Sequence, residues 1–119
     1  MRIDCLSIND KNGLDRVYVL LNSIKQTKNK DTTIVYHLII EDLDQTIKQY
    51  FADLESEDFV IQFTECRQFK DKINLPEAKY YCSKNYYTMV RCLCPSYFKQ
   101  LDKVLYLDTD LVFLREGIE

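Results

Sequence analysis

Two aspartates separated by one residue, Asp108 and Asp110, are the residues of this sequence best suited to chemistry. They follow Val104 to Leu107, a short apolar run typical of a buried strand. In an extended segment, residues two apart face the same way, so both carboxylates could address one bound object. Two carboxylates held together repel each other unless a positive charge lies between them, and Mg²⁺, Mn²⁺ and Ca²⁺ all prefer oxygen ligands. The pair therefore predicts a divalent cation at the carboxyl end of a strand.

A polar segment also follows the first strand-like run of the chain, which extends from Arg2 to Ile8. It contains Asn9, Asp10 and Asn12, and it ends at Gly13. Asparagine and aspartate side chains at such a place can bond their own backbone and cap the helix that follows. In open α/β sheets the ligand lies outside the carboxyl ends of the strands, so this loop and the acidic pair are the two candidate site segments.

Hydrophobic periodicity predicts that strands and helices alternate along the chain. Strand-like runs occupy Arg2 to Ile8, Thr32 to Ile40, Asp58 to Thr64 and Lys103 to Leu107. Apolar residues at helical spacing are Leu14, Val17, Tyr18, Leu21 and Ile24, then Leu43, Ile47, Tyr50, Phe51 and Leu54, and finally Tyr86, Val90, Leu93, Tyr97 and Leu101. The order β-α-β-α-β-α-β predicts an α/β fold with a mostly parallel sheet, flanking helices and right-handed crossovers.

The composition excludes several classes of protein. The 119 residues are about the size of one domain. A net charge of −3 with scattered Lys and Arg gives no reason to expect a nucleic-acid partner. No apolar run approaches the roughly 20 residues that span a bilayer. The sequence opens on a strand-like run rather than a signal peptide, which predicts a cytoplasmic location.

The cysteines and the single histidine carry no recognisable metal pattern. Five cysteines stand at irregular spacing, namely Cys5, Cys66, Cys82, Cys92 and Cys94. An odd number without a Cys-x-x-Cys pair indicates reduced, partly buried thiols. His37 lies inside the second strand-like run with no partner motif around it, so we expect a hydrogen-bonded structural histidine rather than a ligand or base.

The segment richest in chemistry stands close to the end of the sequence, since only nine residues follow Asp110. A sheet of this kind would normally continue beyond its fourth strand. We therefore expect the chain to be truncated, as the amino-terminal half of a longer domain.

The stretch from Asp102 to Val112 resembles the Asp-x-Asp segment of glycosyltransferase family 8, whose members include bacterial lipopolysaccharide galactosyltransferases. The resemblance implies a GT-A fold with a Rossmann-like sheet, of which residues 1–119 would be the nucleotide-sugar-binding, amino-terminal part. It also implies transfer of a hexose from a UDP-sugar, with retention of configuration and with Mn²⁺ (or Mg²⁺). The acceptor would be a glycan, a glycolipid or a glycoprotein.

The resemblance also assigns roles to residues of the two candidate segments. Asp108 and Asp110 would bind the metal, and Asp108 would contact the ribose as well. Thr109 would present its backbone near the nucleotide. The remaining contacts to the nucleotide sugar would come from Leu6, Ser7, Ile8, Asn9, Asn12 and Arg91.

The chain departs from the family pattern in two places. Where the family carries a tyrosine that stacks on uracil, this sequence has Asn12 and Gly13, which leaves Tyr18 or Tyr87 as substitutes. The family's third metal ligand is a histidine in its carboxyl-terminal half, and His37 lies in the wrong strand to replace it. We therefore expect the 119 residues alone to be inactive.

Other interpretations of the same residues stay open. Asp108 and Asp110 could form a solvated acidic turn, Asn9 and Asp10 could serve only as helix caps, and Arg91 could make a structural ion pair. A strand followed by Asp-x-Asp also resembles the nucleophile loop of haloacid-dehalogenase-like phosphatases, although there it begins the domain. The chain could equally be a non-catalytic nucleotide-binding or assembly domain. A homo-oligomer and a position at the inner face of the membrane both remain open.

Overall fold

A parallel sheet of four strands organises the computed structural model, which describes residues 1–72, 94–115 and 118. The strands are β1 (Arg2–Asn9), β2 (Thr33–Ile40), β3 (Phe59–Glu65) and β4 (Leu105–Tyr106). Their order across the sheet is β3-β2-β1-β4, and each neighbouring pair is parallel. The expected α/β fold with a mostly parallel sheet is therefore confirmed.

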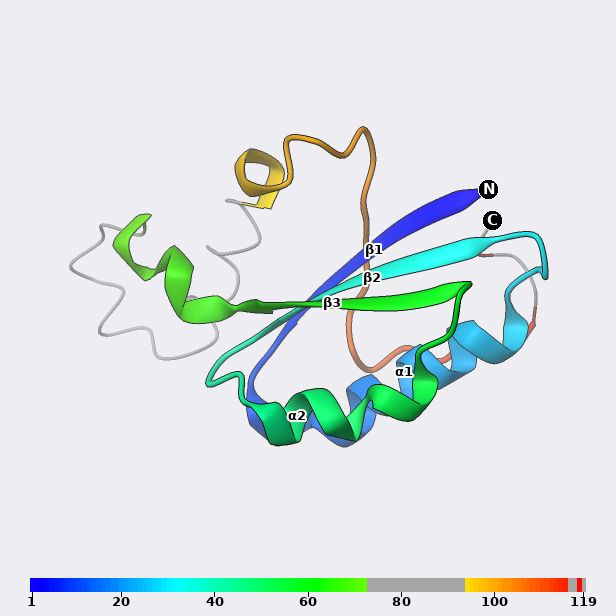
Figure 1. Ribbon diagram of the computed structural model, residues 1–119, viewed down its shortest axis with the longest axis horizontal. Helices are drawn as coiled ribbons and strands as arrows, with labels where there is room; N and C mark the ends of the chain where they lie inside the picture. The colour runs from blue at the N-terminus through cyan, green and yellow to red at the C-terminus, as the bar shows by residue number, and fades with distance from the viewer. Residues whose placement is uncertain (73–93, 116–117, 119) are drawn as a thin grey trace.

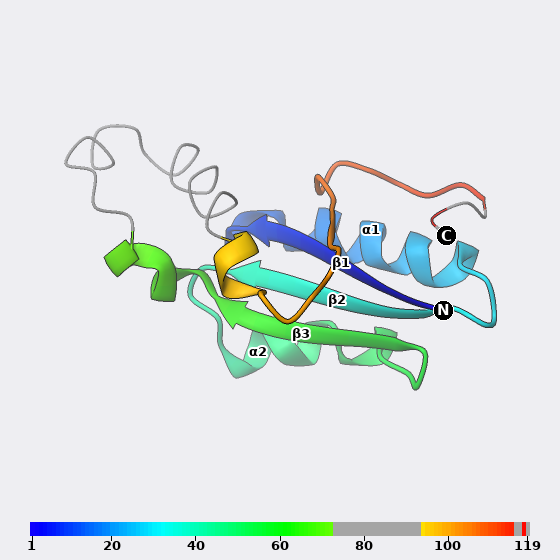
Figure 2. The same ribbon diagram turned by 90° about the horizontal axis from the view of Figure 1, so that it is seen from above.

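The two α-helices, α1 (Leu14–Thr27) and α2 (Gln45–Tyr50), cover the same face of the sheet (Figures 1 and 2). A helical turn at residues 94–97 lies over the opposite face. Short 3₁₀ segments occupy Lys11–Gly13, Ala52–Leu54 and Cys66–Lys72. Within the part of the chain that the structure describes, no helix has the length and apolar character needed to cross a membrane.

Aspartate side chains begin the helical segments that follow β1 and β2. The side chain of Asp10 accepts a hydrogen bond from the backbone N–H of Asn12 at 2.9 Å, before the 3₁₀ turn that leads into α1. Asp44 accepts from the N–H of Ile47 at 2.8 Å and caps α2. Each bond satisfies a backbone donor that the first turn of a helix leaves without a partner, which fixes where the helix starts.

Apolar side chains form a core on each face of the sheet because successive strand residues point to opposite faces. The core on the α1 and α2 side includes Val17, Leu21, Ile34, Tyr36, Phe51 and Phe59, all fully buried. The smaller core on the other side contains Leu6, Ile8, Ile39, Cys66, Phe69, Cys94 and Phe98. Burial on both faces explains why seven of the eight residues of β2 are buried.

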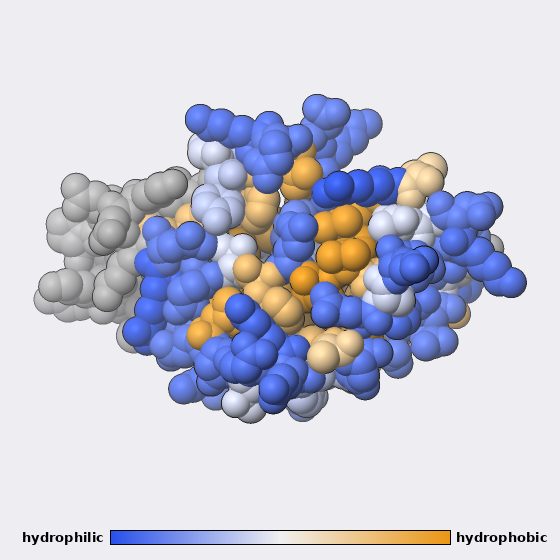
Figure 3. Space-filling view, in the orientation of Figure 1, coloured by the Kyte–Doolittle hydropathy of each residue, from blue (hydrophilic) through white to orange (hydrophobic). Residues whose placement is uncertain are grey.

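The surface in Figure 3 is mostly hydrophilic at its periphery, while hydrophobic residues gather near the middle, where Figure 1 shows the strands. Several large apolar side chains of the described residues are exposed, among them Leu105 and Leu114. Both belong to the segment that contains β4 and the chain after it.

The fourth strand differs from its prediction. The sequence predicts a fully buried strand up to Leu107, whereas β4 contains only Leu105 and Tyr106, and Leu105 is 41% exposed. Within the described part of the sheet, β4 is an edge strand that pairs with β1 alone. An edge strand has a neighbour on one side only, so its apolar run is neither fully paired nor fully covered.

Other expectations are met in part. The second helical stripe, Leu43 to Leu54, is divided between α2 and the 3₁₀ turn Ala52–Leu54. Of the third stripe, residues 94–97 are helical, and the positions up to residue 93 lie outside the described residues. Cys5, Cys66 and Cys94 are buried as expected, and burial raises the pKa of Cys5 to about 12. The other two cysteines lie outside the described residues.

Candidate functional site

The carboxyl ends of β1 and β4 lie next to each other. Leu6 of β1 pairs in register with Tyr106 of β4, and the N–H of Leu107 donates to the carbonyl of Leu6 at 2.9 Å. Three residues further along, Asn9 Nδ2 donates to Thr109 Oγ1 at 3.1 Å. Two segments that are 100 residues apart in sequence are therefore joined where both strands end.

This junction is a topological switch point of the sheet. From β1 the chain proceeds to β2 and β3 on one side, and it returns to place β4 on the other. Two neighbouring parallel strands whose connections lead away in opposite directions leave a crevice at their carboxyl ends, where open α/β sheets bind their ligands.

A hollow of about 270 Å³ occupies that crevice, and we call it the strand-end hollow. Its lining residues come from the end of β1, the turn after it, α1 and the chain after β4: Ile8, Asn9, Asp10, Asn12, Gly13, Arg16 and Thr109. Asn9 Oδ1 is buried and has no hydrogen-bond partner among the described residues. A buried acceptor without a partner is unfavourable, so a donor group of a ligand would be stabilised there.

The structure divides the residues expected to contact a nucleotide. Ile8, Asn9, Asn12 and Thr109 line the strand-end hollow, whereas Leu6 and Ser7 do not. Leu6 packs in the smaller core. Ser7 is fully buried and accepts a hydrogen bond from the hydroxyl of Tyr36 at 3.0 Å. The expected contact from Arg91 lies outside the described residues.

The two acidic residues lie on either side of Thr109, and both are exposed. Asp110 lines a second hollow of about 270 Å³, the acidic-side hollow, together with Asp15, Arg16, Val19, Thr109, Leu111 and Val112. Within the described ranges, no three or more His, Cys, Asp or Glu side chains form a group able to hold a metal ion. Two carboxylates still suit a hard cation that takes its other ligands from water and substrate phosphates, as Mg²⁺ commonly does.

A model of the family described as "Glycosyl transferase family 8" matches residues 5–118, almost the whole chain. The chain belongs to glycosyltransferase family 8. No curated protein sequence matches it.

Solved structures of glycosyltransferases share the fold of this family 8 chain. The apo structure of the bifunctional glycosyltransferase WbbM superimposes with a TM-score of 0.79 at 18% identity, over 97% of this chain and 20% of that one. The galactosyltransferase LgtC in complex with donor and acceptor sugar analogs gives 0.68 at 21% identity, over 98% and 40%. Apo mouse xyloside xylosyltransferase 1 gives 0.66 at 16% identity, over 98% and 46%. The chain therefore spans less than half of each of these proteins, and the GT-A fold expected for the sheet and its helices is confirmed.

Arg16 is a residue of the candidate site that sequence reasoning missed. It is exposed, stands in the first turn of α1 and lines both hollows. The signal that could have found it is its position, because the first turn of a helix that follows a strand lies beside the carboxyl end of that strand.

Tyr18, expected as a substitute for a stacking tyrosine, does not line either hollow. Its hydroxyl donates to Asp53 at 2.6 Å.

His37 lies apart from the strand-end hollow and is satisfied within the fold, as expected. It is 3% exposed, its Nε2 is 2.9 Å from Asp4 Oδ1, and its ring lies edge-on to Phe98. Burial raises the pKa of Asp4, but hydrogen bonds from Arg2 and His37 outweigh it and hold that pKa below its usual value. The group is structural, and it ties β1 to β2 and to the turn that carries Phe98.

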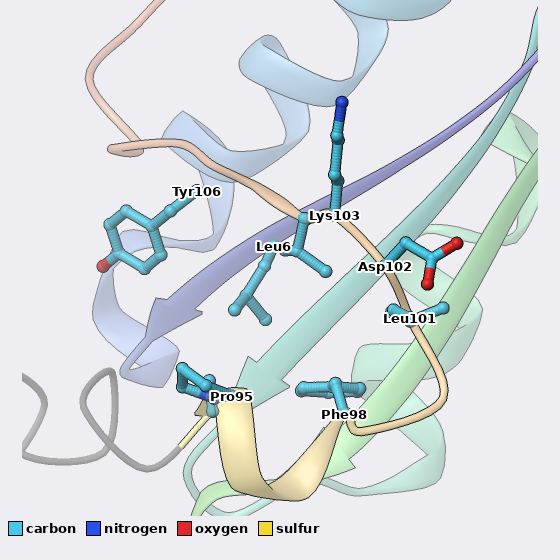
Figure 4. Close-up of a pocket in the computed structure, with 9 residues that line it drawn as sticks. Leu6, Pro95, Phe98, Leu101, Asp102, Lys103 and Tyr106 are labelled. Atoms are coloured by element: carbon cyan, nitrogen blue, oxygen red, sulfur yellow. The ribbon is translucent and has the colours of Figure 1, made fainter.

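A different hollow, of about 330 Å³, lies on the face of the sheet opposite α1 and α2. Figure 4 shows Leu6 of β1 facing Pro95 and Phe98 of the helical turn, with the amine of Lys103 extending away. The remaining lining residues are Cys94, Leu101, Asp102, Val104 and Tyr106. This lining is mainly apolar and lacks Asn9, Thr109 and the acidic pair, so this hollow is distinct from the candidate site.

Proposed function

We propose that the chain binds the nucleotide of a UDP-sugar in the strand-end hollow, as the amino-terminal part of a retaining family 8 hexosyltransferase. The hydrogen bond from Asn9 to Thr109 carries this proposal, because it holds the loop after β1 against the acidic pair. The family match over residues 5–118 favours this interpretation over a haloacid-dehalogenase-like phosphatase.

The strand-end hollow suits one portion of the donor rather than the whole molecule. Its volume of about 270 Å³ lies just below the roughly 300–1,000 Å³ of pockets for drug-sized ligands. A ribose hydroxyl or a base N–H is a suitable donor for the unpartnered Asn9 Oδ1. The nucleoside would therefore occupy this hollow, with its diphosphate towards Asp108 and Asp110.

Asp108 and Asp110 would hold Mn²⁺ (or Mg²⁺), since their oxygens are the donors that such cations prefer. When bound, the metal ion acts as a Lewis acid and offsets the negative charge that develops on the leaving diphosphate. Asp108 would also face the ribose. Thr109, fixed by Asn9 on one side, would keep the two carboxylates at a constant position relative to the nucleoside.

The names of the structural neighbours support the class of reaction. LgtC is a galactosyltransferase seen with donor and acceptor sugar analogs, and the mouse enzyme is a xylosyltransferase. Because the chain spans 20–46% of these proteins, we propose that transfer to a glycan, glycolipid or glycoprotein acceptor needs residues beyond these 119. The 119 residues would bind the donor in the cytoplasm without transferring its sugar.

Calorimetric titration of the chain with UDP, with and without Mn²⁺, tests the proposal. We expect UDP binding to depend on Mn²⁺ and to weaken about tenfold or more in Asp110→Ala. Mutation of a residue that only hydrogen-bonds to a metal ligand already costs about 10–100-fold in metal affinity, so loss of a ligand itself should cost at least as much. Asp31→Ala, which removes an exposed carboxylate between α1 and β2, is the matched control and should bind as wild type. Binding that is independent of the metal and unchanged by Asp110→Ala would contradict the proposed site.

A further inference from the structure

Arg16 is the residue that the strand-end hollow and the acidic-side hollow share besides Thr109. It is exposed in the first turn of α1, so its side chain reaches both hollows from the helix. A ligand that enters either hollow therefore lies beside Arg16.

The guanidinium of Arg16 has no recorded ion pair or hydrogen bond with the described residues. Arg2 and Arg67 differ in this respect. Arg2 pairs with Asp4 at 2.9 Å, and Arg67 pairs with Asp42 at 2.6 Å. Arg16 lies close to Asp15 and Asp110 along the same hollow, yet no contact within 4.0 Å is recorded with either. Among the residues that the structure describes, none pairs with its planar group.

No aromatic side chain lines either hollow among the residues that the structure describes. A nucleobase is commonly held by stacking on a planar side chain, and a guanidinium group serves as well as an aromatic ring. Tyr18, the tyrosine of α1, packs against Tyr50 and Phe51. Arg16 thus carries the largest planar side-chain group among the described residues that line the two hollows.

We propose that the guanidinium of Arg16 stacks on the nucleobase of the donor and so positions the nucleoside in the strand-end hollow. The inference rests on the proposed function, since it assumes that a nucleotide occupies this hollow. It makes Arg16 a binding residue through its planar shape. A contact between its charge and the diphosphate is the competing role, and the two roles respond differently to substitution.

Substitutions at Arg16 separate shape from charge. Arg16→Lys keeps the charge and removes the plane, Arg16→Tyr keeps a plane and removes the charge, and Arg16→Ala removes both. Stacking on a base is worth about 1–3 kcal/mol by alanine substitution. At about 1.4 kcal/mol for each factor of ten, that corresponds to a loss of affinity of roughly 5- to 150-fold.

The experiment is calorimetry of each variant with UDP in the presence of Mn²⁺, and with pyrophosphate in the presence of Mg²⁺. We expect Arg16→Ala and Arg16→Lys to weaken UDP binding by a similar factor in that range, and Arg16→Tyr to restore most of it. Pyrophosphate should bind all variants as it binds wild type. Arg2→Lys, at the amino end of β1, is the control.

Two results would overturn the inference while leaving the proposed function intact. One is full UDP affinity in Arg16→Lys with weaker pyrophosphate binding in Arg16→Ala, which would assign a charge contact. The other is an unchanged UDP affinity in Arg16→Ala. Failure of wild type to bind UDP at all would instead reject the proposed function, and the inference with it. Unchanged thermal midpoints show that the variants fold, as expected for an exposed side chain.

Discussion

The amine of Lys28 belongs to a buried side chain and is paired with acceptor groups of neighbouring residues. The Lys28 side chain is 4% exposed, and its Nζ lies 2.5 Å from Asp58 Oδ2 and 2.9 Å from the carbonyl of Thr32. The hydroxyl of Ser56 donates to the other oxygen of Asp58 at 2.6 Å. A buried ammonium group needs such partners, because an unpaired charge away from water is strongly unfavourable.

This contact predicts how stability responds to acid. Hydrogen bonds from Lys28 and then from Ser56 lower the pKa of Asp58 to about 2, against an ordinary value of 3.8. A carboxyl group whose pKa is lower in the folded state stabilises the fold above its unfolded pKa, and this contribution is lost as pH falls through the folded pKa. We expect the thermal midpoint of Asp58→Asn to lie below that of wild type from pH 7 to about pH 5.

The difference between the two thermal midpoints should then shrink between about pH 4 and pH 2, where wild type loses the same contribution. Thermal scans across this range make the measurement. Asp31→Asn is the control, since no side-chain bond of Asp31 is recorded among the described residues. If the difference in thermal midpoint between Asp58→Asn and wild type stays constant down to pH 2, the ionised Asp58 carboxylate does not stabilise the fold.

At the site, sequence reasoning placed some residues and misplaced others for geometric reasons. Asn9, Asn12 and Thr109 could be predicted because polar residues that follow neighbouring parallel strands meet at one edge of the sheet. The side chains of Leu6 and Ser7 belong to the core, since each lies inside β1 with its side chain against a packed face. Arg16 was missed because a charged residue on an exposed helix face is ordinary, and only the fold shows that two hollows adjoin it.

At the scale of the elements, α2 shows how side-chain hydrogen bonds fix the start of a short helix. The helix has only six residues, too few for stability from its own hydrogen bonds. Asp44 caps it, and the Glu65 carboxylate accepts from the backbone N–H groups of Asp42 and Leu43, each at 3.1 Å. Asp42 has a φ of 58°, in the left-handed region, just before the helix begins. Side-chain bonds to the backbone therefore hold the entry to α2.

Asp44→Ala should lower the free energy of unfolding by about 1 kcal/mol, the usual cost of losing an N-cap side chain. The N–H of Ile47 then loses the side-chain acceptor to which it donates in wild type. Urea denaturation of both proteins measures the difference. Gln49→Ala, an exposed substitution in the same helix, should be neutral or slightly stabilising because alanine is the best helix former. Equal losses in both variants would mean that the cap contributes nothing specific.

The strands illustrate which parts of a sheet can be predicted from periodicity. The first three strands match their predicted spans within two residues, because apolar runs buried in a parallel sheet are distinctive. The fourth run, Lys103 to Leu107, is also mostly apolar, but it forms a two-residue edge strand. The composition of a strand does not predict how many neighbouring strands it pairs with. That depends on the order of strands across the sheet, which arises from the whole fold.

Across the whole molecule, the segment after β4 returns along α1 and fixes the acidic pair between two elements. The N–H of Phe113 donates to Ser23 Oγ of α1 at 3.0 Å, and the Phe113 ring packs against the core of that face. Figure 1 shows this part of the chain, in orange, running beside the helix. Asp108 and Asp110 thus lie between β4, which is bound to β1, and a segment bound to α1. Strand order and helix packing together place them at the switch point.

The central claim is that the ends of β1 and β4 together hold a nucleoside diphosphate and its cation. Bound Mn²⁺ broadens the NMR signals of nearby nuclei, so titrating it into ¹⁵N-labelled chain with UDP present locates the ion directly. We predict that the backbone signals of residues 108–110 and 8–10 disappear first, while those at the end of β3 persist. Broadening centred instead on Glu41 and Asp42, the acidic residues after β2, would contradict the account.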